Sequence, residues 1–339
     1  MIRDWAITYK SLQLSGLSTL SYIFDFTFYS TILIVSTALG RLLPPMYHEF
    51  LLFDISLRYT FLPQATVPVW LLVLISAGIP ILQFLLFAIF FKSLSIKRRL
   101  WDFFAGCLCL LGAQATQIWA VSLLKNITGL PRPDMIERCE PMVQTIPITQ
   151  LSNVAICTQS NWNVVMEGFR SFPSGHASTV FCGMVITSLN MAAKLQTFDK
   201  RNNSFKVFLT IAPLLGAAFV AGTRVSDNRH FLRDVIAGSI LGTFVGASFY
   251  HQYHPSIFQL TSRGRAFPPR RFGISKFFRN VGGFWRVEDS GLPEEDAEIR
   301  TIENVDVERR MQEMGQGENV KVKTLADNIK FVNMLEPEM

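Results

Sequence analysis

Three short polar clusters in this 339-residue chain contain residue types that could act on an anion. They are the segments "KNITGLPRPD", "FPSGHAS" and "TRVSDNRHFLRD". Their chemically capable members are Lys125 and Arg132 in the first, Ser174, Gly175 and His176 in the second, and Arg224, His230 and Asp234 in the third. Three cations, two imidazoles, one carboxylate and a Ser-Gly turn together suit a phosphate monoester or anhydride as substrate.

The cations would hold the phosphoryl group. Arg132 and Arg224 can each bind two phosphate oxygens through a guanidinium fork, and Lys125 can act as a point charge. The N–H groups of Ser174 and Gly175 would add positive dipoles, because they would point outward from a helix start. No metal site is implied, since the chain lacks a carboxylate cluster for magnesium and its cysteines lack the spacing of zinc ligands.

The two histidines would divide the chemistry. His230 can attack phosphorus through an unprotonated nitrogen, and Asp234 can accept a hydrogen bond from the other ring nitrogen. His176 can protonate the leaving oxygen and then activate water. Taken singly, each feature also has a structural explanation: interfacial anchors for the cations, a helix cap for Ser174, and a surface pair for His230 with Asp234. The combination favours catalysis.

The rest of the sequence indicates a membrane protein of the all-α class. Hydrophobic residues make up 49% of the chain, 17% are charged, and the mean hydropathy is +0.28. A bilayer core takes about 20 apolar residues to cross. Six stretches are long enough, and they predict a six-helix transmembrane bundle with spans at 21–40, 67–91, 101–124, 175–193, 207–223 and 232–250.

These spans place all three clusters at one face of the membrane. Loops on the other face carry many Lys and Arg residues, among them Lys92, Lys97, Arg98, Arg99, Lys194, Lys200, Arg201, Lys206, Arg263, Arg265, Arg270 and Arg271. By the positive-inside rule that face is cytoplasmic, together with both chain ends, and the active site faces the lumen or the outside. The net charge of +6 therefore marks cytoplasmic loops and does not indicate nucleic-acid binding.

The domain organisation follows from these spans. We expect a cytoplasmic segment at 1–20, a catalytic membrane domain at 21–256 and a cytoplasmic, largely disordered tail at 257–339. Cys139 and Cys157 lie in the long loop on the non-cytoplasmic side, where disulfides are permitted, so we expect them to be bridged. Cysteines inside the spans are expected to be small packing residues.

The three clusters resemble the signature of the type 2 phosphatidic acid phosphatase superfamily. That signature is Lys, six residues, Arg-Pro; then Pro-Ser-Gly-His; then Ser-Arg, five residues, His, three residues, Asp. The segments "GLPRPDMIERCEP", "EGFRSFPSGHAST" and "RVSDNRHFLRDV" are similar to fungal lipid phosphate and diacylglycerol pyrophosphate phosphatases. The resemblance covers roughly residues 20–270.

The resemblance implies a role for each matching residue. Lys125, Arg132 and Arg224 would be phosphate ligands, helped by Ser174 and Gly175. His176 would be the general acid, His230 the nucleophile and Asp234 its orienting partner. It also implies six spans, independence from magnesium and no cofactor. Thr223 stands where the family usually has serine, although it keeps the hydroxyl, and "HFLRD" lacks the second histidine and the tryptophan common in lipid phosphatases. Substrate choice therefore stays open.

The leading hypothesis is an integral-membrane lipid phosphate phosphatase acting on phosphatidate, lysophosphatidate or diacylglycerol pyrophosphate. One alternative is a lipid phosphotransferase that passes phosphate to an alcohol. Another is a non-catalytic lipid-binding or transport protein, although no span resembles a pair of broken half-helices. The expected partners are the phospholipid substrate and the bilayer, with a homo-oligomer left open. The expected location is the plasma membrane or an endomembrane such as vacuole, Golgi or ER.

Overall fold

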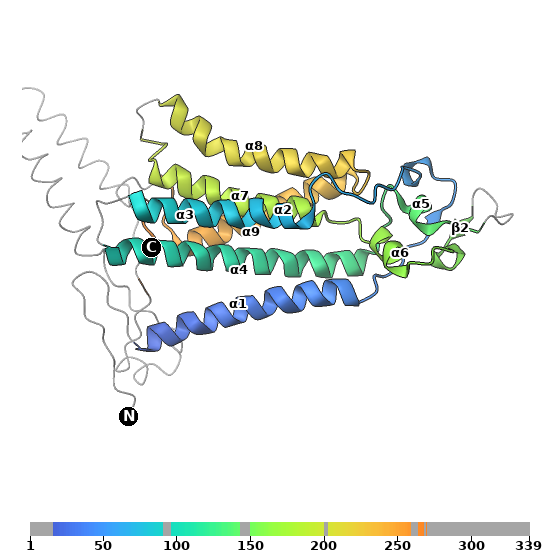
Figure 1. Ribbon diagram of the computed structural model, residues 1–339, viewed down its shortest axis with the longest axis horizontal. Helices are drawn as coiled ribbons and strands as arrows, with labels where there is room; N and C mark the ends of the chain where they lie inside the picture. The colour runs from blue at the N-terminus through green and yellow to red at the C-terminus, as the bar shows by residue number, and fades with distance from the viewer. Residues whose placement is uncertain are drawn as a thin grey trace, which may run out of the picture.

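The computed structural model describes residues 16–90, 96–142, 150–199, 203–258, 264–267 and 269. Its long helices run side by side and form an elongated bundle (Figure 1). They are α1 (Gly16–Leu42), α2 (Val69–Val73), the π-helical turn η2 (Leu74–Gly78), α3 (Ile79–Phe90), α4 (Ile96–Thr128), α7 (Gly175–Lys194), α8 (Ser204–Ser226) and α9 (Leu232–Tyr253). Helices α2 and α3 form one rod through η2, and the direction of the rods alternates along the chain.

Five described helical rods are long and apolar enough to cross a membrane. They are α1, the α2–α3 rod, α4, α8 and α9, and five of the predicted spans fall on them. The fourth predicted span, 175–193, coincides with α7, which is not among the five. Helix α7 packs against α3, α4, α8 and α9 and buries polar residues, including Ser178, Thr187 and Asn190. Because other helices cover it, α7 needs less apolar surface than a lipid-facing helix.

Helix α9 lies close to α7 because glycines on one face of α9 meet the α7 backbone. A Cβ at Gly238 would lie 2.4 Å from the Ser174 carbonyl oxygen, and one at Gly242 would lie 2.2 Å from that of Ser178. Gly246 continues the stripe one turn further. Small residues four apart allow close approach of helices in membranes. The contact joins the start of α7 to the first turns of α9.

The π-helical turn η2 lies just before Pro80. Proline has no N–H and cannot donate to the carbonyl four residues earlier, which belongs to Ser76. Gln114 Nε2 of α4 donates to this carbonyl at 3.4 Å. Gly183 of α7 contacts the same backbone, since a Cβ there would lie 2.0 Å from the Ser76 oxygen. A neighbouring helix thus satisfies the carbonyl that proline leaves free, as a bilayer interior requires.

A small cap covers one end of the bundle, which we call the cap end (Figure 1). Its elements are β1 (Phe50–Leu51), the 3₁₀ turn η1 (Ile55–Leu57), α5 (Met135–Cys139), β2 (Leu151–Ser152), the 3₁₀ turn η3 (Val154–Ile156) and α6 (Trp162–Gly168). The strands pair antiparallel with Phe50 opposite Ser152, and a disulfide joins Cys139 to Cys157. The buried apolar core of the cap consists of Phe50, Leu57, Met135, Cys139, Val165 and Phe169.

The opposite end, which we call the tail end, is closed by residues 264–267, which return to α4 after α9. Asp102 of α4 accepts a hydrogen bond from the Ala266 N–H at 3.1 Å and pairs with Lys194 Nζ of α7 at 2.8 Å. Trp101 Nε1 donates to the Phe267 carbonyl at 2.7 Å. The segment therefore fastens the chain beyond α9 to the ends of two other helices.

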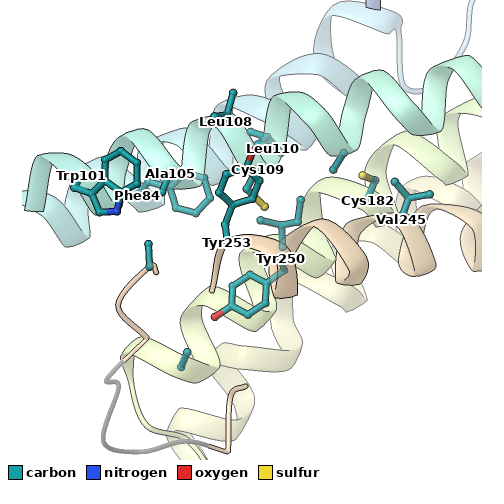
Figure 2. Packing of buried hydrophobic residues seen from close by; sticks show 14 of the residues in the cluster. Phe84, Trp101, Ala105, Leu108, Cys109, Leu110, Cys182, Val245, Tyr250 and Tyr253 are labelled. Carbon is teal, nitrogen blue, oxygen red and sulfur yellow. The ribbon is translucent and has the colours of Figure 1, made fainter. Parts of the chain in front are cut away.

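A hydrophobic cluster from several helices lies beside this segment (Figure 2). It joins Phe84 of α3, Trp101 of α4 and Tyr250 of α9. Cys109 and Cys182 are buried in it as free thiols, which is the packing role predicted for cysteines within spans.

Of the predicted terminal segments, residues 1–15 and most of the tail lie outside the described residues. So do Lys92, Lys200, Arg201, Arg263, Arg270 and Arg271.

Candidate active site

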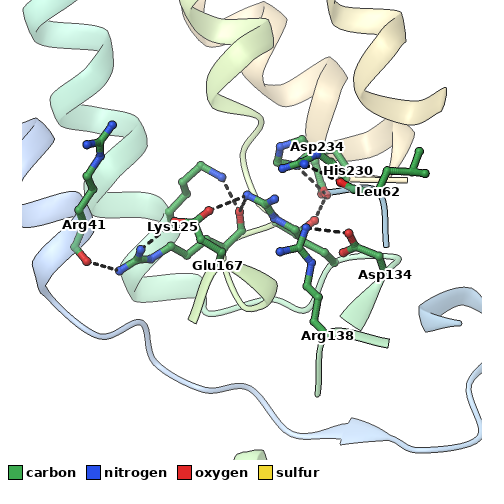
Figure 3. A network of polar contacts seen from close by, with 12 residues as sticks. Arg41, Leu62, Lys125, Asp134, Arg138, Glu167, His230 and Asp234 are labelled. Carbon is green, nitrogen blue, oxygen red and sulfur yellow. Dashed lines mark hydrogen bonds and ion pairs between the residues drawn. The ribbon is translucent and has the colours of Figure 1, made fainter. Parts of the chain in front are cut away.

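All three polar clusters meet at the cap end. Lys125 lies in the last turn of α4, His176 in the first turn of α7 and Arg224 in the last turn of α8. His230 lies between α8 and α9, and Asp234 lies in the first turn of α9. Figure 3 shows part of the polar network that joins them. Alternation of the helices therefore brings together residues that are far apart in the sequence.

Lys125 and Arg132 converge on one backbone carbonyl, that of Arg170. Lys125 Nζ donates to it, and Arg132 Nη2 lies 3.4 Å from it. Between the two cations, Gly129 adopts a φ of +54°, and a Cβ there would overlap the Met46 carbonyl oxygen. Only glycine fits this left-handed position at the helix end. The turn at Gly129 therefore sets the path that returns Arg132 to Lys125.

Arg170 reaches in two directions. Its carbonyl holds the two cations, while its guanidinium Nη2 donates to the carbonyls of Leu43 at 2.6 Å and Arg41 at 3.3 Å, at the end of α1. Its Nη1 donates to Glu167 Oε1 at 2.9 Å. Arg170 is thus a buried connector between α1, α6 and two cations, Lys125 in the last turn of α4 and Arg132 after it.

Glu167 is the carboxylate nearest to this cation pair. Its Oε2 lies 3.2 Å from Arg132 Nη2, and its side chain is 47% exposed while that of Arg132 is 7% exposed. Burial would raise the pKa of Glu167, but Arg132, Lys125 and Arg170 outweigh that effect and lower it to about 2. Burial also lowers the pKa of Arg132 to about 10, against the attraction of Glu167. Both groups are therefore charged at neutral pH.

Arg224 is held from two sides. Its Nε and Nη2 donate to the Thr223 hydroxyl at 3.2 and 2.9 Å, and Nη2 pairs with Asp227 at 2.8 Å. Asp227 in turn accepts from the hydroxyl and the N–H of Thr66 at 2.5 and 3.0 Å. The Nη1 of Arg224 is buried and has no partner among the described residues. Thr223 therefore does use the hydroxyl that it shares with serine.

The Pro-Ser-Gly-His turn differs from the prediction in one respect. Ser174 occupies the N-cap position of α7, but its N–H donates to the Asp234 carbonyl at 2.9 Å and so is not available to an anion. The close approach of Gly238 to Ser174 explains this bond. The Ser174 hydroxyl is buried and has no described partner. Gly175 faces the Lys125 side chain, since a Cβ there would lie 3.7 Å from Lys125 Cε.

The two histidines lie within electrostatic range of each other and of the cations. His176 Nε2 lies 3.3 Å from the Val67 carbonyl oxygen, just before α2. His230 is 4% exposed, and burial, then Lys125, Arg132 and His176, hold its pKa well below the ordinary value. A backbone hydrogen bond with Ser171 acts in the opposite direction. The imidazole of His230 is therefore neutral at pH 7.

Asp234 faces His230 without the hydrogen bond that the sequence predicted. His230 Nδ1 lies 4.0 Å from Asp234 Oδ2, beyond hydrogen-bond distance. That oxygen instead accepts from the Ser171 hydroxyl at 2.5 Å and from the Phe231 N–H at 3.1 Å. His230 Nδ1 and Asp234 Oδ1 are buried and accept or donate no described hydrogen bond, although Arg233 Nε lies 3.7 Å from Asp234 Oδ1. Catalytic hydrogen bonds are often long before the substrate binds, and the predicted orienting role of Asp234 would require a small movement of the ring.

Four site residues were not predicted from the sequence: Glu167, Arg170, Ser171 and Asp227. Glu167 and Arg170 lie within the quoted segment "EGFRSFPSGHAST", and their spacing of three residues is that of a helical ion pair. That spacing is the one signal that could have indicated them. Asp227 has the same spacing from its partner Arg224, whereas Ser171 carries no comparable local pattern, because its partner Asp234 lies far away in the sequence.

Comparison with known proteins agrees with this geometry. Residues 106–258, which contain all three clusters, match the PAP2 superfamily, and the chain belongs to this superfamily. Among its relatives is the probable diacylglycerol pyrophosphate phosphatase 1 of Schizosaccharomyces pombe, 32% identical over 64% of this chain and 75% of that protein. The lipid phosphate phosphatase 2 of Arabidopsis thaliana is 35% identical over 62% of this chain and 70% of that protein. The diacylglycerol pyrophosphate phosphatase 1 of Saccharomyces cerevisiae is 30% identical over 63% of this chain and 73% of that protein. No solved structure matches the chain.

Proposed function

We propose that this integral-membrane protein is a lipid phosphate phosphatase, which hydrolyses the phosphate ester or anhydride of lipids such as phosphatidate, lysophosphatidate or diacylglycerol pyrophosphate. The observation that carries the proposal is the meeting of the buried His230 with Lys125, Arg132 and His176 at the cap end, where burial and these neighbours hold the pKa of His230 well below its ordinary value. Cations around an uncharged nucleophile suit a substrate with two negative charges. The names of the relatives support the same class of substrate.

The reaction would proceed through a phosphohistidine. Since His230 Nδ1 faces Asp234, Nε2 is the nitrogen left to attack phosphorus. The bond from phosphorus to the leaving oxygen breaks as the N–P bond forms, and His176 gives a proton to that oxygen. His176 then takes a proton from water, which attacks phosphorus and releases inorganic phosphate and free His230.

Cations from the chain itself would stabilise the transferred phosphoryl group. Lys125, Arg132 and Arg224 surround the site, and Arg224 Nη1 is a buried donor without a described partner. The Ser174 hydroxyl is a second such group. These groups could stabilise the equatorial oxygens of the transition state without a metal ion. Activity is therefore expected to be independent of magnesium.

The site would face the lumen or the outside of the cell. The predicted topology puts the basic loop residues Lys97, Arg98 and Arg99 on the cytoplasmic side, and in the bundle they lie at the tail end, where α4 begins. A phosphate headgroup lies at the depth of the helix ends, so a lipid could reach His230 with its acyl chains still in the bilayer. Cysteines introduced at 150–153 and at Lys97 should be labelled from opposite sides of sealed vesicles.

The decisive experiment measures phosphate release by the purified protein from phosphatidate and diacylglycerol pyrophosphate in EDTA. We expect release with no alcohol acceptor present, and no release by the His230→Ala variant. Release only after an alcohol is added would favour a phosphotransferase. Loss of activity in EDTA with recovery in magnesium would refute the metal-free mechanism, and phosphatidate binding without turnover would indicate a non-catalytic lipid-binding protein.

A further inference from the structure

Glu167 brings a negative charge into a site built to bind a negative group. Its two carboxylate oxygens pair with Arg132 Nη2 at 3.2 Å and with Arg170 Nη1 at 2.9 Å. The two arginines are almost fully buried, whereas the Glu167 side chain is 47% exposed. The carboxylate thus lies at the boundary between the buried cations and the outside, on the approach to Arg132.

Arg132, one of the two arginines that Glu167 contacts, makes few other side-chain hydrogen bonds among the described residues. Arg132 Nη2 also reaches the Arg170 carbonyl at a weaker 3.4 Å, and Arg132 Nε is buried without a described partner. A carboxylate and a phosphate group bind the same N–H donors of a guanidinium, in the plane of that group. A phosphoryl group that binds Arg132 through its fork must therefore share this edge with Glu167 or displace the carboxylate from it.

The surrounding contacts allow Glu167 to move without releasing the other groups. Lys125 is held by the Arg170 carbonyl, and the Arg170 guanidinium is held by the carbonyls of Leu43 and Arg41. None of these bonds involves the Glu167 carboxylate. Displacement of the carboxylate toward solvent would leave the cations in place, because a half-exposed side chain has room to rotate outward.

We propose that Glu167 is an internal competitor for the phosphate site: it neutralises Arg132 in the empty enzyme, exchanges with the phosphoryl group of the substrate, and returns as inorganic phosphate leaves. This role rests on the proposed function and concerns product release. Without such a carboxylate, a site with several cations would hold the phosphate product tightly, because a dianion interacts strongly with partly buried cations. Glu167 is thus a positioning residue whose charge weakens binding of product.

The test compares Glu167→Gln with the wild-type protein in two measurements. Titration calorimetry gives the affinity for inorganic phosphate, and inhibition of phosphatidate hydrolysis gives the inhibition constant of phosphate. In the variant both should show about tenfold tighter binding, since a nearby negative charge has been removed from a half-exposed position. KM should fall as well, and kcat should fall because product leaves more slowly.

Two further variants control the test. Glu140→Gln neutralises an exposed cap carboxylate whose partner is Gln159, and phosphate affinity should not change. Glu167→Asp keeps the charge on a shorter side chain that cannot contact both arginines, and phosphate affinity should rise by an intermediate factor. This variant also carries the test if Glu167→Gln does not fold.

Each outcome decides something. Unchanged or weaker phosphate binding in Glu167→Gln, with a higher KM, would show that Glu167 only braces the arginines, and the proposed competition would be wrong. If the wild-type protein releases phosphate from lipid but Glu167→Gln binds phosphate no more tightly, the role of Glu167 is refuted and the proposed function stays intact. Wild-type protein that neither binds phosphate nor hydrolyses the lipid would refute both.

Discussion

The two ends of the bundle gather the same types of charged residue around different acceptors. At the tail end the acceptor is a carboxylate, since Asp102 pairs with Lys194 at 2.8 Å and lies 3.7 Å from Arg98 Nε. At the cap end Lys125 and Arg132 share a neutral acceptor, the carbonyl of Arg170, and the carboxylate that pairs with Arg132, that of Glu167, is 47% exposed. The first cluster holds the chain together, and the second keeps the carboxylate of Glu167 at the surface.

The difference shows how a membrane protein can use buried cations for structure or for binding. A carboxylate among cations neutralises them, so the cluster serves to fasten α4, α7 and the segment at 264–267. A carbonyl orients cations without removing their charge, and the half-exposed Glu167 is the carboxylate that we propose an incoming anion displaces. The predictions below test this division by the activity each variant should lose.

The largest loss is expected from His230→Ala. Removal of the proposed nucleophile should lower the rate of phosphate release at least about a thousandfold. The protein should stay folded, because His230 Nδ1 makes no described hydrogen bond and loss of the backbone hydrogen bond with Ser171 costs only about 1 kcal/mol. His251→Ala, at the exposed tail end of α9, is the matched control and should keep normal activity. A His230→Ala variant with appreciable turnover would falsify the assignment of the nucleophile.

A smaller loss is expected from Gly238→Ala. The added Cβ would lie 2.4 Å from the Ser174 carbonyl oxygen and must push α9 away from the start of α7. His176 lies in the first turn of α7 and His230 lies just before α9, so this shift would move the two histidines apart. We therefore expect kcat/KM to fall about tenfold. Gly216→Ala on α8 meets no atom within 4 Å and should have no such effect. Equal activity of the two variants would show that the close approach does not set the site.

Asp102→Asn should affect stability far more than catalysis. Its loss leaves Lys194 and Arg98 without their carboxylate, and such broken buried pairs cost about 3–5 kcal/mol. Thermal unfolding should detect this, while the folded fraction keeps kcat/KM within about twofold because the site lies at the other end. Asp199→Asn removes the partner of the more exposed Lys206 and should cost about 1 kcal/mol or less. A strong catalytic loss in Asp102→Asn would contradict the separation of the two ends.

The smallest change is expected on acidification from pH 7.5 to 6. The pKa of His230 lies well below the ordinary value for histidine. The imidazole therefore stays neutral as the pH falls through that ordinary value. An ordinary histidine with a pKa near 6.5 would be about three-quarters protonated at pH 6. We expect kcat/KM to change less than about twofold once the titration of the substrate, followed by phosphorus NMR, is taken into account. A threefold or larger fall would indicate an unperturbed nucleophile.

The sequence predicted the helices and the meeting of the three polar clusters at one end of the bundle, because both depend on local patterns. Apolar runs define the rods, and the position of each cluster at a span end defines which side of the bundle it occupies. Helix α7 shows the limit for the fold, since its polar residues such as Asn190 make sense only once other helices cover it.

The contacts within the site were less predictable, because they depend on how closely two helices approach. The Ser174 N–H meets the Asp234 carbonyl only because Gly238 brings α9 against α7. The Ser171 hydroxyl likewise takes the carboxylate oxygen that the sequence assigned to His230. The Arg170 carbonyl has no side-chain signal at all, so its role in orienting Lys125 could only come from the structure.

The guanidinium of Arg170 gives α1 a mechanical connection to the site. It binds the carbonyls of Arg41 and Leu43, and its own carbonyl orients Lys125 and Arg132. Helix α1 packs mainly on α4, and only 6% of its apolar stretch is buried, so lipid surrounds most of it. Helices of this kind change their tilt when the bilayer becomes thicker or thinner. A change in membrane thickness would therefore pull on Arg170, and through its carbonyl on Lys125 and Arg132, the proposed phosphate ligands.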